Sequence, residues 1–348
     1  MSPVVLSILA SSLGLGTMIT FASSNWFLAW MGLEMNTLAI LPLMTKLSHP
    51  RAVEAAVKYF LMQATAAATF LFACVSNAWI CGEWSTDFTS HPFPLTLATF
   101  SLAMKIGLAP LHAWVPEILQ GLDLPTGLII ATWQKLAPFI LLLQLHQTNV
   151  GILIGIGLLS TLAGGWGGMN QTQLRKILAY SSIAHLGWTI LVLPFSPTLA
   201  ILTLLTYFIM TFSTFLVFTL NKATSVNALA TSWMKAPSIA CLTPIILLSL
   251  AGLPPLTGFM PKWLILQELT SQGLAFTAIF AALSSLLSLY FYLRISYAIT
   301  LTMFPNSFPA TIPWRLTSLM SSLPLSLFVI ATIAFMPLMP AILALLSR

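Results

Sequence analysis

Charge is what this sequence has least of. Of its 348 residues, 6% are Asp, Glu, Lys or Arg, whereas a typical soluble domain has about 25%. Apolar residues make up 58% of the chain, and the mean hydropathy is +0.96. So few charges cannot solvate the surface of a water-soluble globule, and they exclude a disordered chain and a nucleic-acid-binding surface. The composition predicts a multi-spanning membrane protein with no nucleic-acid partner.

Cysteine is also scarce. The three cysteines, Cys74, Cys81 and Cys241, form no Cys-x-x-Cys pair and have no histidine at ligand spacing. This pattern argues against a disulfide framework, a zinc site and an iron–sulfur cluster. The glycine-rich segment Gly164–Gly168 lacks the Gly-Lys-Ser/Thr of a phosphate loop, so close helix packing is the better interpretation. We expect no metal and no cofactor in this chain.

Long apolar runs dominate the sequence. A bilayer core about 30 Å thick needs roughly 20 apolar residues per helix. Eleven segments meet this need and predict an all-α polytopic membrane protein. They are 3–22, 25–45, 53–79, 95–120, 124–146, 149–169, 174–194, 197–220, 239–268, 273–301 and 321–346.

The loop charges predict the orientation of these spans. Basic residues on the N-terminal side are Lys46, Arg51, Arg175, Lys176, Lys222, Lys235, Arg294 and Arg315, whereas the other side has Glu83, Asp87, Glu268 and the terminal Arg348. Because basic loops stay on the side of synthesis, we expect the N-terminus in the cytoplasm or its organellar equivalent, the matrix. The chain begins without a basic or Arg-rich leader, which suggests insertion close to its place of synthesis.

Four ionisable residues lie inside predicted spans, far from any loop: Glu34, Lys105, Lys135 and Lys262. Each charge at the bilayer centre costs about 2.5–3.5 kcal/mol, so the groups must be paired, hydrated or neutralised. They could join helices through an inert polar seam, but a route for ions or protons is the interpretation we favour. One carboxylate and three lysines leave an excess of positive charge, and burial together with repulsion favours a neutral amine for part of the time. Such a lysine is a proton carrier, and an ion pair between Glu34 and Lys105 would hold its proton.

Two histidines, His112 and His185, also lie within predicted spans. Histidine titrates near neutrality and can relay protons. A buried histidine that only donates a hydrogen bond in the packing is an equally good interpretation of each. His49, His91 and His146 fall at loops or helix ends, where we expect surface residues.

Two segments of the sequence match each other in register. Gly107–Glu117 reads GLAPLHAWVPE and Gly252–Lys262 reads GLPPLTGFMPK. Their prolines remove backbone donors, so both helices should be broken within the membrane. The copies lie five spans apart and therefore run in opposite directions, which is typical of inverted repeats with paired broken helices. We predict a single transmembrane domain, 1–348, with repeats at about 1–146 and 147–301 and an appended helix at about 321–346.

The segment Lys105–Glu117, KIGLAPLHAWVPE, resembles the lysine-bearing broken helix of the antiporter-like subunits of respiratory complex I. Relatives of those subunits are the large subunits of multi-subunit cation/proton antiporters. The segments Trp30–Asn36, WMGLEMN, and Ser181–Gly187, SSIAHLG, also match the family. The resemblance covers essentially the whole chain. The length, the span count and the absent presequence narrow it to mitochondrially encoded members from animals.

The resemblance implies a proton-pumping core subunit of NADH:ubiquinone oxidoreductase in the mitochondrial inner membrane, with its N-terminus in the matrix and its C-terminus in the intermembrane space. NADH, FMN, iron–sulfur clusters and ubiquinone would be bound by other subunits. Its partners would be other membrane-arm subunits, including a neighbouring antiporter-like subunit, and lipids such as cardiolipin. The residues implied in proton transfer are Glu34, Lys105, Lys135, Lys262, His112 and His185. Glu117 is expected to be a helix-end charge outside this set.

Two other functions fit the same residues. A stand-alone cation/proton antiporter would need no partner, although a solitary Glu34 and an excess of lysine disfavour a Na⁺ site, which needs oxygen ligands. A structural spacer of the membrane arm, with charges that no longer act, would tolerate the loss of its buried lysines.

Overall fold

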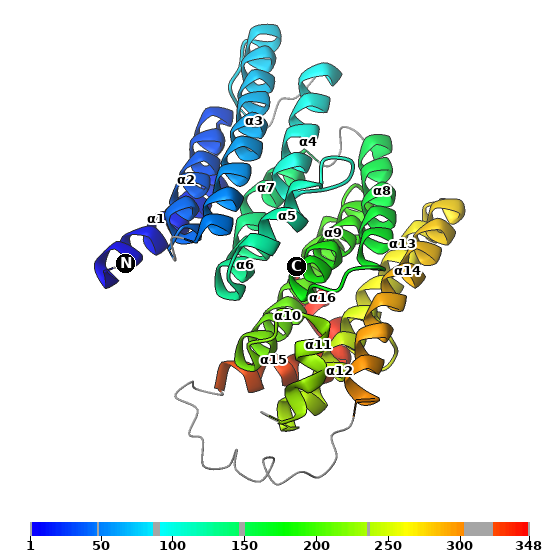
Figure 1. Cartoon of the computed structure of the whole chain (residues 1–348). Helices are drawn as coiled ribbons and strands as arrows, with labels where there is room; N and C mark the ends of the chain where they lie inside the picture. The colour runs from blue at the N-terminus through cyan, green and yellow to red at the C-terminus, as the bar shows by residue number, and fades with distance from the viewer. Residues whose placement is uncertain are drawn as a thin grey trace. The chain divides into compact units, whose positions relative to one another are not determined.

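The computed structural model describes residues 2–46, 49–85, 91–145, 150–234, 237–302 and 323–346 (Figure 1). Within these ranges every regular element is a helix, and extended pairing is limited to isolated bridges. His146 and the loop charges Asp87, Lys235, Arg315 and Arg348 lie outside the described residues.

The chain divides into two compact units, Met1–Ile156 and Gly157–Arg348, and the boundary falls inside α8. The helices up to that boundary are α1 (Pro3–Ala22), α2 (Trp26–Met44), α3 (Pro50–Cys81), α4 (Pro92–Ile106), α5 (Trp114–Gly121), α6 (Leu124–Ala131), α7 (Trp133–Gln144) and α8 (Val150–Gly168). Those that follow are α9 (Leu174–Val192), α10 (Pro197–Asn221), α11 (Val226–Ala230), η1 (Thr231–Met234), α12 (Pro237–Ala251), α13 (Phe259–Ser271), α14 (Ala275–Thr300), α15 (Leu323–Ala334), η4 (Met336–Leu338) and α16 (Met339–Leu346).

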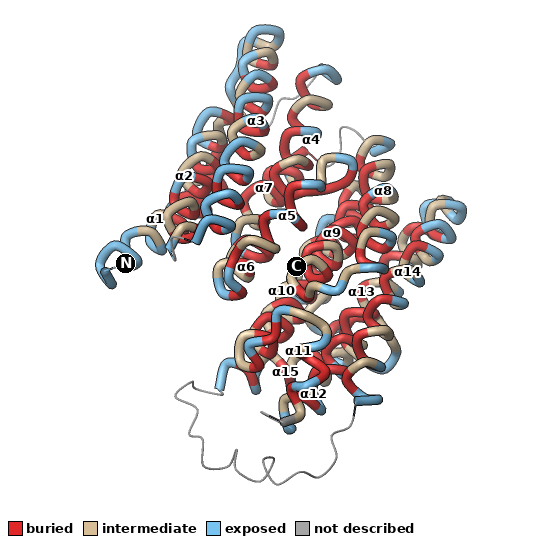
Figure 2. Tube along the Cα trace, viewed as in Figure 1, coloured by how far each residue is buried: buried red, intermediate tan, exposed pale blue. Residues whose placement is uncertain are grey.

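In the first unit, α1 packs closely on α2 through two glycines. A Cβ on Gly32 would lie 2.6 Å from the methyl carbon of Thr20 and 2.9 Å from the carbonyl oxygen of Gly16. Helix α3 lies beside α4 (Figure 1), and it is buried along one side and exposed along the other (Figure 2). Small residues let membrane helices approach in this way, because lipid offers no hydrophobic driving force between them.

The first predicted break is present. Helix α4 ends at Ile106 because Gly107 takes a left-handed φ of +85°, which only glycine adopts freely. A Cβ there would also lie 2.3 Å from Cγ2 of Val115. The backbone runs outside helical pairing until α5 begins at Trp114.

The second break repeats this arrangement in the other unit. Helix α12 ends at Ala251, Gly252 has a φ of +81°, and α13 begins at Phe259. The returning chain packs against the backbone of α12, since a Cβ on Gly258 would lie 1.9 Å from the carbonyl oxygen of Ser249. The Pro-Gly pattern therefore predicted both discontinuities correctly.

The units share a further feature that the sequence pattern did not reveal. Asn25 forms an isolated antiparallel bridge with Ser85 in the first unit, and Gln173 forms one with Ser225 in the second. In both bridges, the residue after the first partner donates its backbone N–H to the carbonyl of the residue before the second, at 3.1 Å. Asn25 and Gln173 occupy the N-cap positions of α2 and α9.

Helix length and composition give fewer spans than the predicted eleven. Among the described residues, seven helices are long and apolar enough to cross a membrane, and the pair α15 and α16, bent by 68°, would make an eighth. The other three predicted spans correspond to α4 with α5, to α12 with α13, and to α9. The first two are divided by the breaks. The count of eleven stays a prediction.

The glycine-rich end of α8 is a packing motif, as expected. A Cβ on Gly164 would lie 2.6 Å from the backbone nitrogen of Ala184, and a Cβ on Gly168 would lie 2.8 Å from the ring of Phe291. These glycines let the end of α8 pack closely against α9 and α14. Trp166, between them, is 73% exposed and points away from that packing.

Replacing Gly167 by alanine should destabilise the packing of α8 against α9. The new Cβ would lie 2.2 Å from Cε1 of Tyr180, so the ring must shift, and overpacking of this kind costs about 1–3 kcal/mol. A lower midpoint of thermal unfolding of the purified protein assembly would measure the loss. Gly155→Ala on the same helix is the control, because its Cβ would meet nothing within 4 Å. Equal midpoints for the two variants would contradict the packing role.

Candidate functional site

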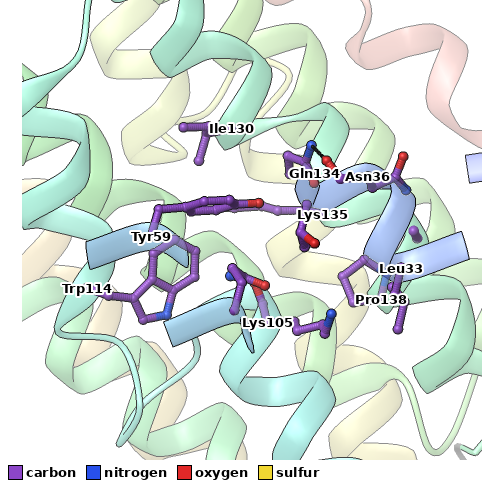
Figure 3. Close-up of a pocket in the computed structure, with 12 residues that line it drawn as sticks. Leu33, Asn36, Tyr59, Lys105, Trp114, Ile130, Gln134, Lys135 and Pro138 are labelled. Carbon is purple, nitrogen blue, oxygen red and sulfur yellow. Dashed lines mark hydrogen bonds between the residues drawn. The ribbon is translucent and has the colours of Figure 1, made fainter. Parts of the chain in front are cut away.

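Lys105 and Lys135 line one small cavity in the first unit (Figure 3). Their exposed fractions are 5% and 3%, so both side chains are withdrawn from the surface of the described structure. The cavity measures about 10 Å³, which is close to the space that one water molecule needs. Its other lining residues are Leu33, Asn36, Thr37, Tyr59, Gln63, Trp114, Ile130, Gln134, Ala137 and Pro138.

The first break determines the position of Lys105 at the end of α4. It lies in the last turn of that helix, where the partial negative charge of the helix end favours a cation. The carbonyls exposed by the break are bonded: Gln63 Nε2 donates to Lys105 O at 3.3 Å, and Trp114 Nε1 donates to Met104 O at 3.1 Å. The Lys105 Nζ itself has no hydrogen-bond partner among the described protein atoms.

Glu34 does not form the expected ion pair with Lys105. Within the described ranges, the ion pairs closer than 4.0 Å all involve Lys58. The half-buried Glu34 carboxylate instead accepts a hydrogen bond from Thr37 Oγ1 at 3.0 Å, one turn along its own helix. A local partner on α2 therefore replaces the long-range one that the sequence suggested.

Glu117 lies apart from the lysine cavity, as expected. Its Oε2 is 2.9 Å from Lys58 Nζ, which is also 2.8 Å from Glu54 Oε1. All three side chains are largely exposed. This network ties the start of α3 to α5 at the surface, and the sequence pattern gave no hint that Lys58 is its centre.

Lys262 caps the second break. It is on α13, and its Nζ donates to the carbonyl oxygen of Ala251, the last residue of α12, at 2.8 Å. Its side chain crosses Gly252, where a Cβ would lie 3.0 Å from Nζ. The Nζ is also 6.0 Å from the ring centroid of Trp188, within the range of a cation–π contact.

His185 shares a second small cavity with Lys262. This cavity measures about 20 Å³ and is also lined by Thr203, Thr206 and Met210. The His185 ring lies 5.7 Å from the ring of Tyr207, centroid to centroid. The structure thus brings His185 and Lys262 together in the second unit, and Lys105 and Lys135 together in the first.

His112 is half-buried in the first break and is not among the residues that line the lysine cavity. Its register partner in the second break, Thr257, donates Oγ1 to the carbonyl of Thr332 on α15 at 2.7 Å. His49 and His91, which we expected at the surface, are exposed at the N-cap positions of α3 and α4.

The bridges described above set a common register for the two units. Glu34 follows Asn25 by nine residues, and Ser182 follows Gln173 by nine residues. The second unit therefore has a hydroxyl where the first has a carboxylate. In the same register, Thr37 corresponds to His185, so titratable groups stand on neighbouring turns of α2 and α9 in the two units.

Uncharged polar residues of the site were missed by sequence reasoning. Asn36 is 2% exposed and Gln63 is 4% exposed, and both line the lysine cavity. Gln134, beside Lys135, donates its Nε2 to the carbonyl of Asn36 at 3.2 Å. The available signal was an amide side chain inside a predicted span, which is costly to bury without a partner.

Family models match nearly the whole chain. The model described as NADH:quinone oxidoreductase/Mrp antiporter, TM, matches residues 23–288, and the model described as NADH dehydrogenase subunit 2 C-terminus matches residues 289–343. Curated relatives named NADH-ubiquinone oxidoreductase chain 2 include that of Salmo salar, 61% identical over all 348 residues and all of the relative. That of Gadus morhua is 62% identical over 347 residues, which is 100% of both chains.

Solved structures agree with this assignment. A chain of respiratory complex I from Thermus thermophilus matches with a TM-score of 0.85 and 29% identity, covering 97% of this chain and 78% of that one. A chain of the Mrp complex from Dietzia has the same fold, with a TM-score of 0.76, 17% identity, and coverage of 97% and 74%. The resemblance inferred from the motifs is confirmed. The chain belongs to the NADH:quinone oxidoreductase/Mrp antiporter transmembrane family, in its NADH dehydrogenase subunit 2 branch.

Proposed function

We propose that this chain is the membrane-arm subunit that moves protons in a NADH:ubiquinone oxidoreductase complex. The observation that carries the proposal is the pair of buried lysines, Lys105 and Lys135, around one water-sized cavity beside a broken helix. A lysine buried in a low-dielectric site can lose and regain a proton, which is the property a relay needs. The family assignment and the names of the relatives support this function.

Proton transfer in the first unit runs between Lys105 and Lys135 through their shared cavity. Glu34, on α2, contributes a negative charge to the electrostatic field at the lysines. His112, in the first break, takes part as a proton-transfer group. In the second unit, Lys262 and His185 continue the route. The shared cavities support the roles of Lys105 and Lys135 in the first unit and of Lys262 and His185 in the second. NADH oxidation and quinone reduction belong to other subunits, which hold the redox cofactors.

The chain has eleven spans and is built from two inverted repeats, about 1–146 and 147–301, with an appended helix at about 321–346. Two independent matches support this arrangement: the breaks after Ile106 and Ala251, and the bridged N-caps of α2 and α9. The spans cross the mitochondrial inner membrane with the N-terminus in the matrix and the C-terminus in the intermembrane space. The neighbours are other membrane-arm subunits, including an antiporter-like one, and lipids such as cardiolipin.

Lys135→Met tests the function directly. Methionine keeps the packing volume but carries no proton, so the rate of pumping by an assembled complex should fall by about a hundredfold. The measurement is the initial rate of proton pumping per assembled complex in sealed vesicles, together with the number of protons moved per NADH oxidised. Lys46→Met is the matched control, because Lys46 is exposed just after α2.

Each outcome separates the candidate functions. An unchanged proton count in a normally assembled Lys135→Met complex would favour the structural spacer. Cation-dependent proton exchange by the purified chain alone would favour the stand-alone antiporter. Loss of pumping in Lys135→Met with normal pumping in Lys46→Met is the result expected here.

A further inference from the structure

Asn36 places a side-chain amide in the middle of α2 with no hydrogen-bond partner among the described protein atoms. It is 2% exposed, and neither Nδ2 nor Oδ1 has a hydrogen-bond partner among the described protein atoms. Leaving a buried amide unbonded costs about 1–3 kcal/mol on mutational scales. Asn36 lines the same cavity as Lys105, whose Nζ is also unpartnered (Figure 3).

Helix packing does not require this amide. The side chain lies against Gly16 of α1, where a Cβ would be 2.5 Å from Asn36 Oδ1. In the register set by the bridges, Gly164 corresponds to Gly16 and Ala184 corresponds to Asn36. The same close contact is present there, since a Cβ on Gly164 would lie 2.6 Å from the backbone nitrogen of Ala184. Alanine therefore suffices for the packing, and the amide of the first unit needs another explanation.

The backbone of Asn36 is fixed relative to the lysines. Gln134 Nε2 donates to Asn36 O at 3.2 Å, and Gln134 directly precedes Lys135 on α7. Gln63 Nε2 in turn donates to Lys105 O at 3.3 Å. These two bonds hold α2 to α7 and α3 to the end of α4, so the cavity keeps a defined shape.

The size of the cavity and the polar groups around it together fit a water molecule. The cavity of about 10 Å³ has room for about one water molecule. A water with two to four polar partners satisfies buried groups that the protein leaves unbonded. The amide of Asn36 offers both a donor and an acceptor, and the amine of Lys105 offers donors or, when neutral, a lone pair.

We infer that one water molecule binds between the side-chain amide of Asn36 and the Nζ of Lys105, and that Asn36 is a positioning residue for proton transfer between the two lysines. The inference rests on the proposed proton-translocating function. In the step, Lys105 gives a proton to the water oxygen while that water gives one of its own to the amine of Lys135, so the water is regenerated. The amide neither gains nor loses a proton, and it fixes where the water sits.

The experiment compares Asn36→Leu with Asn77→Leu in the assembled complex. Asn77 is a matched control: it is a buried asparagine, 4% exposed, at another cavity of about 10 Å³ that no lysine lines. Asn36→Leu should slow proton-coupled turnover by about tenfold, the rate equivalent of one lost hydrogen bond, enlarge the solvent deuterium isotope effect and displace the pH profile of the rate. Asn77→Leu should leave all three unchanged.

Asn36→Ser provides the conservative variant, since a hydroxyl still donates and accepts, and it should restore most of the rate. A density map of the unaltered complex with no water between Asn36 and Lys105 would overturn the inference, even if a variant fails to assemble. So would an Asn36→Leu complex with normal rates and isotope effect. If that complex is normal while Lys135→Met has lost pumping, only the inference fails. If both complexes pump normally, the proposed function fails as well.

Discussion

Replacing Lys262 by arginine is expected to abolish proton pumping while leaving the complex assembled. The lysine has two separable tasks: its Nζ caps the Ala251 carbonyl at the second break, and its amine carries a proton in the proposed route. Arginine keeps the positive charge and the donors that the carbonyl needs, but it stays protonated in proteins. Pumping should therefore fall by about a hundredfold, as for loss of an acid–base group.

The companion variant Lys262→Met removes both tasks. It should lose pumping and should also reduce the amount of assembled complex, because the Ala251 carbonyl at the end of α12 is left without its donor. Protons moved per NADH oxidised and the yield of complex on a native gel measure the two effects. Full pumping by the Lys262→Arg complex would show that charge and capping alone explain this residue.

Replacing Gly258 by alanine should prevent assembly. The added Cβ would lie 1.9 Å from the carbonyl oxygen of Ser249, and 3.2 Å from Sδ of Met210. The first contact is with the backbone of α12, which cannot rotate away as a side chain can. Separating α13 from α12 would open the second break, so we expect a loss above about 4 kcal/mol, the range reserved for severe mechanisms.

The yield of assembled complex, compared with that of Gly14→Ala, checks this expectation. A Cβ on Gly14 would meet nothing within 4 Å, and alanine favours a helix more than glycine does. The control should therefore assemble normally. A Gly258→Ala complex formed at the unaltered level would mean that the two segments of the break are held less tightly than their contact indicates.

The sequence predicted the breaks because their cause is local. Proline without an N–H acts on its own turn of backbone, so the two broken segments could be identified without tertiary information. The left-handed glycines that end the helices, Gly107 and Gly252, are a finding of the structure. The two small cavities could not be predicted in this way. Lys105 and Lys135 meet because α4 and α7 pack together, and nothing in the sequence between them states that distance.

The partner of Glu34 shows why charge pairing was the weaker prediction. Opposite charges inside a membrane suggest an ion pair, yet Thr37 lies three residues away and reaches the carboxylate without any rearrangement of helices. Helix geometry places residues three apart on one face. A polar residue at that spacing is a nearer partner for a buried carboxylate than a lysine on another helix.

The indole of Trp114 joins the two sides of the first break, because it is the first residue of α5 and bonds the carbonyl of the residue just before Lys105. A tilt of α5 is therefore expected to displace the last turn of α4. The position of the Lys105 amine is thus linked to the angle of α5. We therefore expect a displacement of α5 to reach the Lys105 turn, and a displacement of that turn to reach α5, through this one hydrogen bond.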